Sequence, residues 1–320
     1  MSDRRVRWCG GFLAAMILVA IVAPWAGLAD PTAQPDGLVL RDLPPLSRVE
    51  AVRTADGKLR YAHELRPLPA GGVSIRRGDR RTDLAAEDLA RDWHERPLVL
   101  LGTDTFGRDL ASRIVHGARV SLLVGLTAAA LALVIGAGVG LTAGWAGGWV
   151  DAVLMRATDV VLAVPRLFLA LLLVAILGPS MLHTVLVLAA TPWMAAARLV
   201  RAEVLSLRDS DWVHAARAAG SPPTRLGLVH LLPAALTPLI VETTLRVGDT
   251  ILLEASLSFL GLGVPPPAPS WGNLIADGRD RLLDAWWIST LPGIAVAATV
   301  LSLHLLGEAA RERVERRAAS

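Results

Sequence analysis

The sequence has one cysteine, Cys9, and one lysine, Lys58, in 320 residues, and only 19% of its residues are charged. A single cysteine excludes an intramolecular disulfide and any cysteine-rich zinc site. Because the other basic residues are arginines, the positive charge is almost entirely guanidinium, which suits phosphate headgroups and carboxylates. The arginines lie mostly at the ends of apolar segments. This placement predicts contact with membrane lipid and argues against nucleic-acid binding.

Apolar residues make up 53% of the chain, and the mean hydropathy is +0.49. Several windows of about 20 residues carry little or no charge, which is enough to cross a hydrocarbon core about 30 Å thick. A soluble fold would interrupt such windows with polar positions. The sequence therefore predicts an all-α membrane protein with six transmembrane helices.

The chain divides by composition into a short series of segments. The prediction is a cytoplasmic segment and first helix over 1–29, a polar extracytoplasmic insert over 30–97, an interfacial lead-in over 98–119, a core of five spans over 120–310 and a cytoplasmic tail over 311–320. The first apolar run follows several arginines and suits a retained helix, with a cleaved signal peptide as the alternative. Weak alternation around residues 49–62 predicts a small strand-rich cap within the insert.

The second to sixth spans are expected over 121–143, 160–177, 181–199, 235–260 and 285–306. The distribution of arginines orients them in the membrane. Arginines are dense after the fourth span and in the tail, whereas the turn at Gly178 carries no basic residue. Cytoplasmic loops are enriched in arginine and lysine, so both termini and the loop after the fourth span are expected in the cytoplasm. The chain is therefore expected to be a multi-pass protein of the inner or plasma membrane.

Glycines recur at four-residue intervals in the second span. Gly136 and Gly140 lie on one helix face, where the lack of a side chain allows a neighbouring helix to approach closely. Gly147 and Gly148 fit a flexible turn after the helix. We therefore expect Gly136 and Gly140 to be helix-packing positions.

The arginine-rich loop reads LSLRDSDWVHAARAAGSPPTRLGLVHLLPAAL and predicts two short helices with a bend. Asp209 or Ser210 caps the first helix, which stops at Gly220. Prolines 222 and 223 start the second helix, because proline at the first helical turn sacrifices no hydrogen bond. This second helix is expected to end before Pro233. A helical elbow of this kind, tied to two spans, can transmit the movement of a partner protein.

This loop resembles the EAA loop in permease subunits of binding-protein-dependent ABC importers. More narrowly, GTDTFGRDLASRIVHGARVSL, ATDVVLAVP, EASLSFLGLGVPPPAPSWGNLI and LPGIAVAATVLSLHLLGEAAR are similar to the C-type permease of dipeptide, oligopeptide and nickel importers. The motifs occur in the order of that family and extend over residues 98–311, about two thirds of the chain. His214 stands where the family usually has glutamate, which puts any charged contact there in doubt.

The resemblance implies a function and a set of partners. It implies a B-type permease with which this chain forms a pathway for peptides or a related small solute, two cytoplasmic ABC ATPases that use ATP-Mg, and an extracytoplasmic solute-binding protein. A nickel or metal-chelate importer is the alternative within the family. The expected ATPase-coupling residues are Asp211, His214, Ala215, Ala216, Gly220, Arg225, His230 and Pro233.

No catalytic residue, cofactor site or metal site is expected in this chain. The lone lysine in ADGKLR does not match the phosphate-binding GxxxxGK[ST] pattern. HExxH, GxSxG and Cys/His metal patterns are also missing. The alternative from another class is an intramembrane hydrolase that uses Ser256 or Ser258 with His304.

Four ionisable residues fall in the predicted fifth span: Glu242, Arg246, Asp249 and Glu254. Charged side chains inside a bilayer usually face the bundle interior or an aqueous path. Glu242, Arg246 and Asp249 share one helix face, because they are four and three residues apart. The interpretation is a polar lining of the translocation path, with an intrahelical network that fixes the helix as the alternative. For Glu254, helix placement is the competing role.

Overall fold

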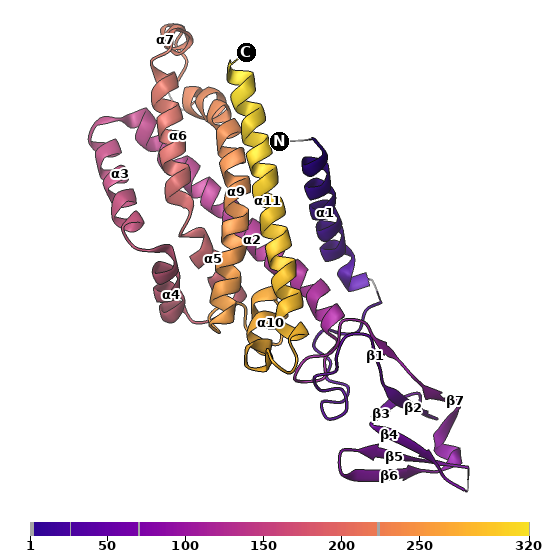
Figure 1. The fold of residues 1–320 in the computed structure, drawn as a ribbon. Coiled ribbons are helices and arrows are strands. Elements are labelled where there is room, and N and C mark those ends of the chain that lie inside the picture. Colours follow the sequence, from indigo (N-terminus) through magenta and orange to yellow (C-terminus); the bar gives the residue numbers. More distant parts are fainter. Residues whose placement is uncertain (1–2, 26, 70, 223–224, 320) are drawn as a thin grey trace. The chain divides into compact units, whose positions relative to one another are not determined.

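The computed structural model describes residues 3–25, 27–69, 71–222 and 225–319. The chain forms two compact units (Figure 1). Unit 1 comprises Met1–Leu18, Ser121–Pro265 and Val296–Ser320, and unit 2 comprises Val19–Val120 and Pro266–Ala295.

Helices dominate the described part of unit 1. Those that lie wholly within it are α3 (Gly148–Leu162), α4 (Arg166–Leu177), α5 (Met181–Ala189), α6 (Trp193–Arg208), α7 (Asp211–Ala218) and α9 (Leu232–Phe259). Three further helices contribute residues to both units: α1 (Asp3–Val22), α2 (Leu110–Ala146) and α11 (Trp287–Ala319).

Four helical segments are long and apolar enough to cross a membrane: Arg4–Trp25, Leu110–Ala146, Met181–Arg208 and Trp287–Val314. Two bent pairs also pass the test, namely α3 with α4, bent by 89°, and Leu226–Ala235 with Pro238–Phe259, bent by 57°. The number of spans is therefore six only if each bent pair crosses once.

The predicted span over 160–177 is not one continuous helix. The helix ends at Leu162 and resumes at Arg166, because Pro165 has no N–H to continue the helical ladder. The interfacial lead-in predicted over 98–119 does not form a helix of its own. Helix α2 begins at Leu110 and continues without a break past residue 119.

The second helix of the predicted elbow does not end before Pro233. Pro223 and Thr224, at its predicted start, lie outside the described residues. A π-helical turn, η3 (Leu226–Leu231), runs directly into α9, whose first turn contains Pro233. Pro233 therefore lies within a continuous helical run, at the junction of the π-helical turn with α9.

Unit 2 contains short antiparallel strands, as predicted for the insert. One sheet has the order β3-β2-β7 (Leu59–Ala62, Glu50–Thr54, Leu89–Glu95), a second has the order β4-β5-β6 (Glu64–Pro67, Val73–Arg77, Arg80–Leu84), and β1 (Ser47–Arg48) pairs with β8 (Leu98–Val99). Val52, Val73 and Ile75 form its buried apolar core together with Ala62 and Leu84. The unit also contains α10 (Trp271–Gly278).

The glycine face of α2 lies against α6. A Cβ atom at Gly136 would come within 2.5 Å of the Trp193 carbonyl oxygen, and one at Gly140 would come within 2.8 Å of the Val200 Cβ. Both distances are too short for a real side chain, so glycine is required for this close approach. The contact joins α2 to α6, the helix that directly precedes the elbow helix α7 in the chain.

Candidate translocation path and coupling loop

The first elbow helix, α7, has ends that match its sequence. Ser210 occupies the N-cap position, although its hydroxyl donates to the Leu207 carbonyl rather than capping α7. Asp211 lies in the first turn and Arg217 in the last, where each charge complements the helix dipole. The helix ends at Ala218, and Gly220 follows its C-cap with a φ of +82°, which favours glycine.

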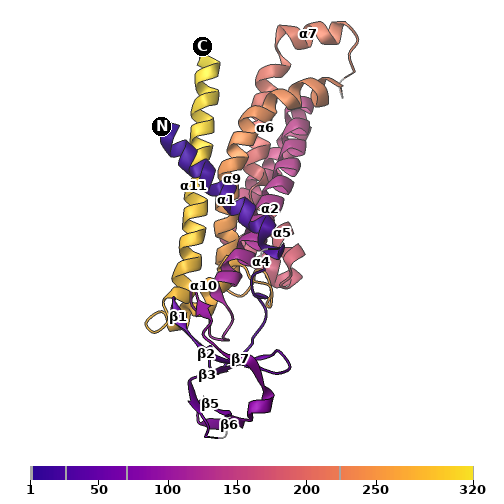
Figure 2. The same cartoon turned by 90° about the vertical axis from the view of Figure 1, so that its right-hand side faces the viewer.

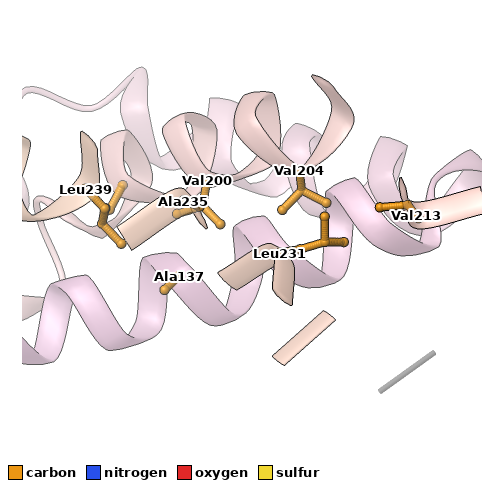
Figure 3. Packing of buried hydrophobic residues seen from close by; sticks show 8 residues of the cluster. Ala137, Val200, Val204, Val213, Leu231, Ala235 and Leu239 are labelled. Carbon is orange, nitrogen blue, oxygen red and sulfur yellow. The ribbon is translucent and has the colours of Figure 1, made fainter. Parts of the chain in front are cut away.

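Val213 anchors α7 to the helical bundle. Its side chain is fully buried in a cluster formed by α2, α6, η3 and α9 (Figure 3). The other members of this cluster are Ala137, Ala196, Val200, Val204, Leu231, Ala235 and Leu239. The Arg217 guanidinium also lies 4.6 Å from the Trp145 ring centre, which adds a cation–π contact to α2. Side-chain packing therefore connects α7 to α2, α6 and α9.

Most of the coupling residues expected from sequence lie on the exposed side of the elbow. Asp211, His214, Ala215, Gly220, Arg225, His230 and Pro233 are exposed, and Ala216 is half-buried. The His230 ring lies edge-on to Trp212, with ring centres 6.2 Å apart. Val213 is not among the coupling residues predicted from sequence, although an aliphatic side chain between Trp212 and His214 was the signal that could have identified it.

The elbow and the tail share one end of unit 1. Figures 1 and 2 show α7 at the same end as the C-terminal part of α11. A cytoplasmic tail would therefore accompany a cytoplasmic elbow.

Three of the predicted path residues form a continuous stripe on α9. Arg246 Nε donates to Glu242 Oε1 at 2.8 Å, and Arg246 Nη1 lies 3.4 Å from Asp249 Oδ2. A seven-residue separation along an α-helix corresponds to about 10 Å. The stripe is thus long enough to line part of a membrane passage.

Two further helices complete this charged face. Arg166 Nη1, on α4, lies 3.8 Å from Asp249 Oδ2, and His304 Nε2, on α11, lies 3.4 Å from Asp249 Oδ1. Their positions in the sequence gave no indication that they meet Asp249. We name Glu242, Arg246, Asp249, Arg166 and His304 the α9 network.

Glu254 faces a different environment from this network. Its side chain is fully buried and accepts hydrogen bonds from Ser121 on α2, at 3.0 Å, and from Ser258, at 2.7 Å. The structure therefore places Glu254 in the contact between α2 and α9, which favours the helix-placement role.

The geometry does not favour the hydrolase alternative. Ser256 donates its hydroxyl hydrogen to the Leu252 carbonyl, Ser258 donates to Glu254, and His304 faces Asp249. Nucleophilic catalysis needs a hydroxyl within hydrogen-bond reach of its base. Within the described ranges, no group of three or more His, Cys, Asp or Glu side chains could hold a metal ion.

Unit 2 contains a second charged group, within the motifs GTDTFGRDLASR and SWGNLIADG. Asp104, which is fully buried, accepts from Arg108 at 2.6 Å and from Arg113 at 2.5 Å. Both arginines also reach Asp277 on α10, at 3.2 and 3.3 Å. We name these four residues the buried cluster. Burial raises the pKa of Asp277 to about 6, with a further increase from Asp104 and an opposing effect from Arg108.

Residues 136–320, more than half of the chain, match the family model for the binding-protein-dependent transport system inner membrane component. The chain is 44% identical over 216 residues to a di/tripeptide transport system permease protein of Pseudomonas aeruginosa, covering 68% of this chain and 71% of that protein. It is 39% identical to a probable D,D-dipeptide transport system permease protein of Escherichia coli, with 68% and 73% covered. It is 38% identical to a glutathione transport system permease protein of Pectobacterium atrosepticum, with 67% and 71% covered.

A solved structure shares the fold. The chain aligns with a chain from the inward-facing MetNI methionine ABC transporter with a TM-score of 0.53 and 17% identity, covering 63% of this chain and 97% of that one. Because the family model covers more than half of the chain and a relative is 44% identical over two thirds of it, the chain belongs to the family of binding-protein-dependent transport system inner membrane components.

Proposed function

We propose that this chain is the inner-membrane permease subunit of an ABC importer that carries di- or tripeptides, or closely related small peptides, into the cell. The relatives named for di/tripeptide, D,D-dipeptide and glutathione transport support this substrate class. The observation that carries the proposal is the α7 elbow, which has an exposed outer surface and a buried anchor at Val213.

The proposed assembly contains a second, B-type permease, two ATPases on the cytoplasmic face and an extracytoplasmic solute-binding protein. ATP-Mg binds to the ATPases, and this chain contributes no cofactor and no covalent chemistry. Closure of the ATPases displaces α7, and Val213 transmits that displacement to α6 and α9. The α9 network then faces the substrate at the interface with the second permease, because charged groups are not stable against lipid tails.

Both termini and the elbow are proposed to be cytoplasmic, and the strand-rich insert extracytoplasmic. Cys9 is the sole cysteine, so Cys9→Ser gives a cysteine-free background for labelling. In intact cells, a membrane-impermeant thiol reagent should label Arg80→Cys, at an exposed position in the insert, but not His214→Cys, at an exposed position on α7. Permeabilised cells should show both. Labelling of His214→Cys in intact cells would overturn the coupling role.

The coupling role also predicts the effect of loosening the anchor. In proteoliposomes that contain all partner subunits, Val213→Ala should lower peptide uptake per ATP hydrolysed by roughly 5-fold or more, because the buried methyl groups that hold α7 are removed. Val153→Ala is the matched control, since Val153 on α3 is 57% exposed. Uptake and ATPase rates measured together give the ratio. A ratio equal to wild type would contradict transmission through Val213, and uptake without ATP would contradict the importer function itself.

A further inference from the structure

The Arg166 side chain has an incomplete set of partners. Its Nε and Nη2 atoms are buried and make no hydrogen bond to any described residue. Its nearest carboxylate, Asp249, lies 3.8 Å from Nη1, which is beyond hydrogen-bond distance. A guanidinium offers five N–H donors and binds carboxylates through two parallel hydrogen bonds. Among the described residues, Arg166 therefore has no carboxylate at bonding distance. Because Nε and Nη2 are covered, Nη1 is the nitrogen through which this cation can meet one.

Asp249 is loosely held in the same way. Three cationic or potentially cationic groups surround it, from Arg246, His304 and Arg166, and the closest of these nitrogen–oxygen distances is 3.4 Å. None matches the 2.7–2.9 Å that is typical of a strong charged hydrogen bond. An incoming ammonium group can therefore approach this carboxylate without displacing a tight partner.

The two side chains line one open cavity of about 360 Å³. Its other lining residues are Leu167, Leu252, Leu253 and Ser256. This volume lies at the lower end of the range for small-molecule sites, about 300–1,000 Å³. One cation, one anion and three leucines in a cavity of this size match a small molecule with a carboxylate, an ammonium group and apolar side chains.

The exposure of Arg166 and Asp249 bears on what covers the cavity in the membrane. Arg166 and Asp249 each leave 34% of the side chain exposed within membrane-spanning segments. A charge exposed to hydrocarbon is costly, so this face is covered by protein or by water within a path. The exposure is thus consistent with a cavity that opens toward the translocation path.

We propose that Arg166 and Asp249 form a binding station for zwitterionic peptides in the path: Arg166 binds the terminal carboxylate and Asp249 binds the terminal ammonium group. This inference rests on the proposed importer function. It assigns Arg166, which lies outside the stripe on α9, a direct role in recognising the peptide.

The test uses the complete importer in proteoliposomes and three forms of alanyl-alanine: the free peptide, its C-terminal amide and its N-acetyl derivative. Initial uptake by each variant is divided by wild-type uptake of the same peptide, which cancels the preference of the solute-binding protein. Arg166→Gln should lower uptake of the free and N-acetyl peptides about 10-fold or more and that of the amide less than about 2-fold. Asp249→Asn should lower uptake of the free peptide and the amide, but not of the N-acetyl peptide.

Arg156→Gln, at an exposed position on α3, is the matched control and should leave all three ratios near one. Arg166→Lys keeps the positive charge but shortens the side chain, so it should give an intermediate loss with the same peptide pattern. This variant decides the test if Arg166→Gln fails to assemble. Where the binding protein excludes a derivative, equilibrium binding to the complex without that protein gives the same ratios.

Equal losses for all three peptides would show that the pair is only structural and would overturn the binding station. If the wild-type complex takes up none of the three peptides, the proposed peptide-importer function fails as well. Uptake by wild type without the crossed pattern in the variants contradicts only the binding station.

Discussion

The buried cluster of unit 2 and the α9 network of unit 1 are built from nearly the same charges but differ in burial. The cluster contains two aspartates and two arginines. In the α9 network, Glu242 and Asp249 face Arg246 and Arg166, with His304 in addition. The side chains of Asp104, Arg108 and Arg113 are at most 7% exposed, whereas those of Arg166, Arg246 and Asp249 are 34–36% exposed. The outer carboxylate of each group, Asp277 or Glu242, is 29% exposed.

The contact distances of the two central carboxylates, Asp104 and Asp249, differ in the same direction. Asp104 binds its two arginines at 2.5 and 2.6 Å, while the contacts of Asp249 range from 3.4 to 3.8 Å. Short contacts to a buried carboxylate fix local geometry, whereas the longer contacts of a half-exposed carboxylate leave it available to a ligand. The comparison therefore separates charges that hold the fold from charges that can serve transport.

The largest expected effect is a loss of unfolding free energy when the buried cluster is disrupted. Asp104→Asn leaves two buried guanidinium groups with only Asp277 as a counter-charge, and removing one partner of a buried pair typically costs about 3–5 kcal/mol. Denaturant unfolding of the purified protein in detergent measures this loss. Asp280→Asn, at a side chain that is 84% exposed, is the control and should change the free energy of unfolding by less than about 0.5 kcal/mol. Equal effects of the two substitutions would contradict the structural role of the cluster.

The pH dependence of Asp277 provides the next largest effect. Its pKa is raised from 3.8 to about 6, so the folded protein holds this proton more tightly than the unfolded chain does. The stabilisation from this group is fully present below pH 3.8 and is lost as the pH rises through about 6, with a magnitude of about 3 kcal/mol.

Asp277→Asn removes this titration while keeping an acceptor oxygen. The free energy of unfolding of the wild type minus that of the variant should therefore increase by about 2–3 kcal/mol when the pH falls from 7.5 to 4. Taking the difference cancels the other carboxylates, such as Glu50, whose pKa is lowered chiefly by its hydrogen bond to His94. A difference that stays constant with pH would show that Asp277 is not desolvated in the protein.

The sequence predicted features that depend on local chemistry. Gly220 follows the C-cap of α7 with a positive φ that suits glycine, and apolar windows marked the long helices. Pro165 lies near the start of the predicted span over 160–177, but the bend of 89° between α3 and α4 could not be predicted from the sequence. Pro233 shows the opposite case, since a proline expected to end a helix lies in the first turn of α9.

The partners of charged residues could not be predicted from their spacing. Glu242, Arg246 and Asp249 share a face of α9 by helical periodicity alone, and the structure shows their contacts. Glu254 lies only five residues beyond Asp249 but is buried against Ser121, because α2 covers that face of the helix. Arg166 reaches Asp249 from α4, so its role required the tertiary arrangement of helices distant in the sequence.

The smallest change in stability is expected for a substitution in the α9 network. Glu242→Gln removes one charge from a side chain that is 29% exposed and paired with Arg246 at 2.7 Å. If water in the path reaches this face, Arg246 remains solvated after the substitution, and the free energy of unfolding changes by only about 0–1 kcal/mol. The same denaturant measurement used for Asp104→Asn applies. A loss of 3 kcal/mol or more would mean that Arg246 is left desolvated, in which case the α9 network belongs with the buried cluster and Glu242 stabilises helix packing rather than lining a path.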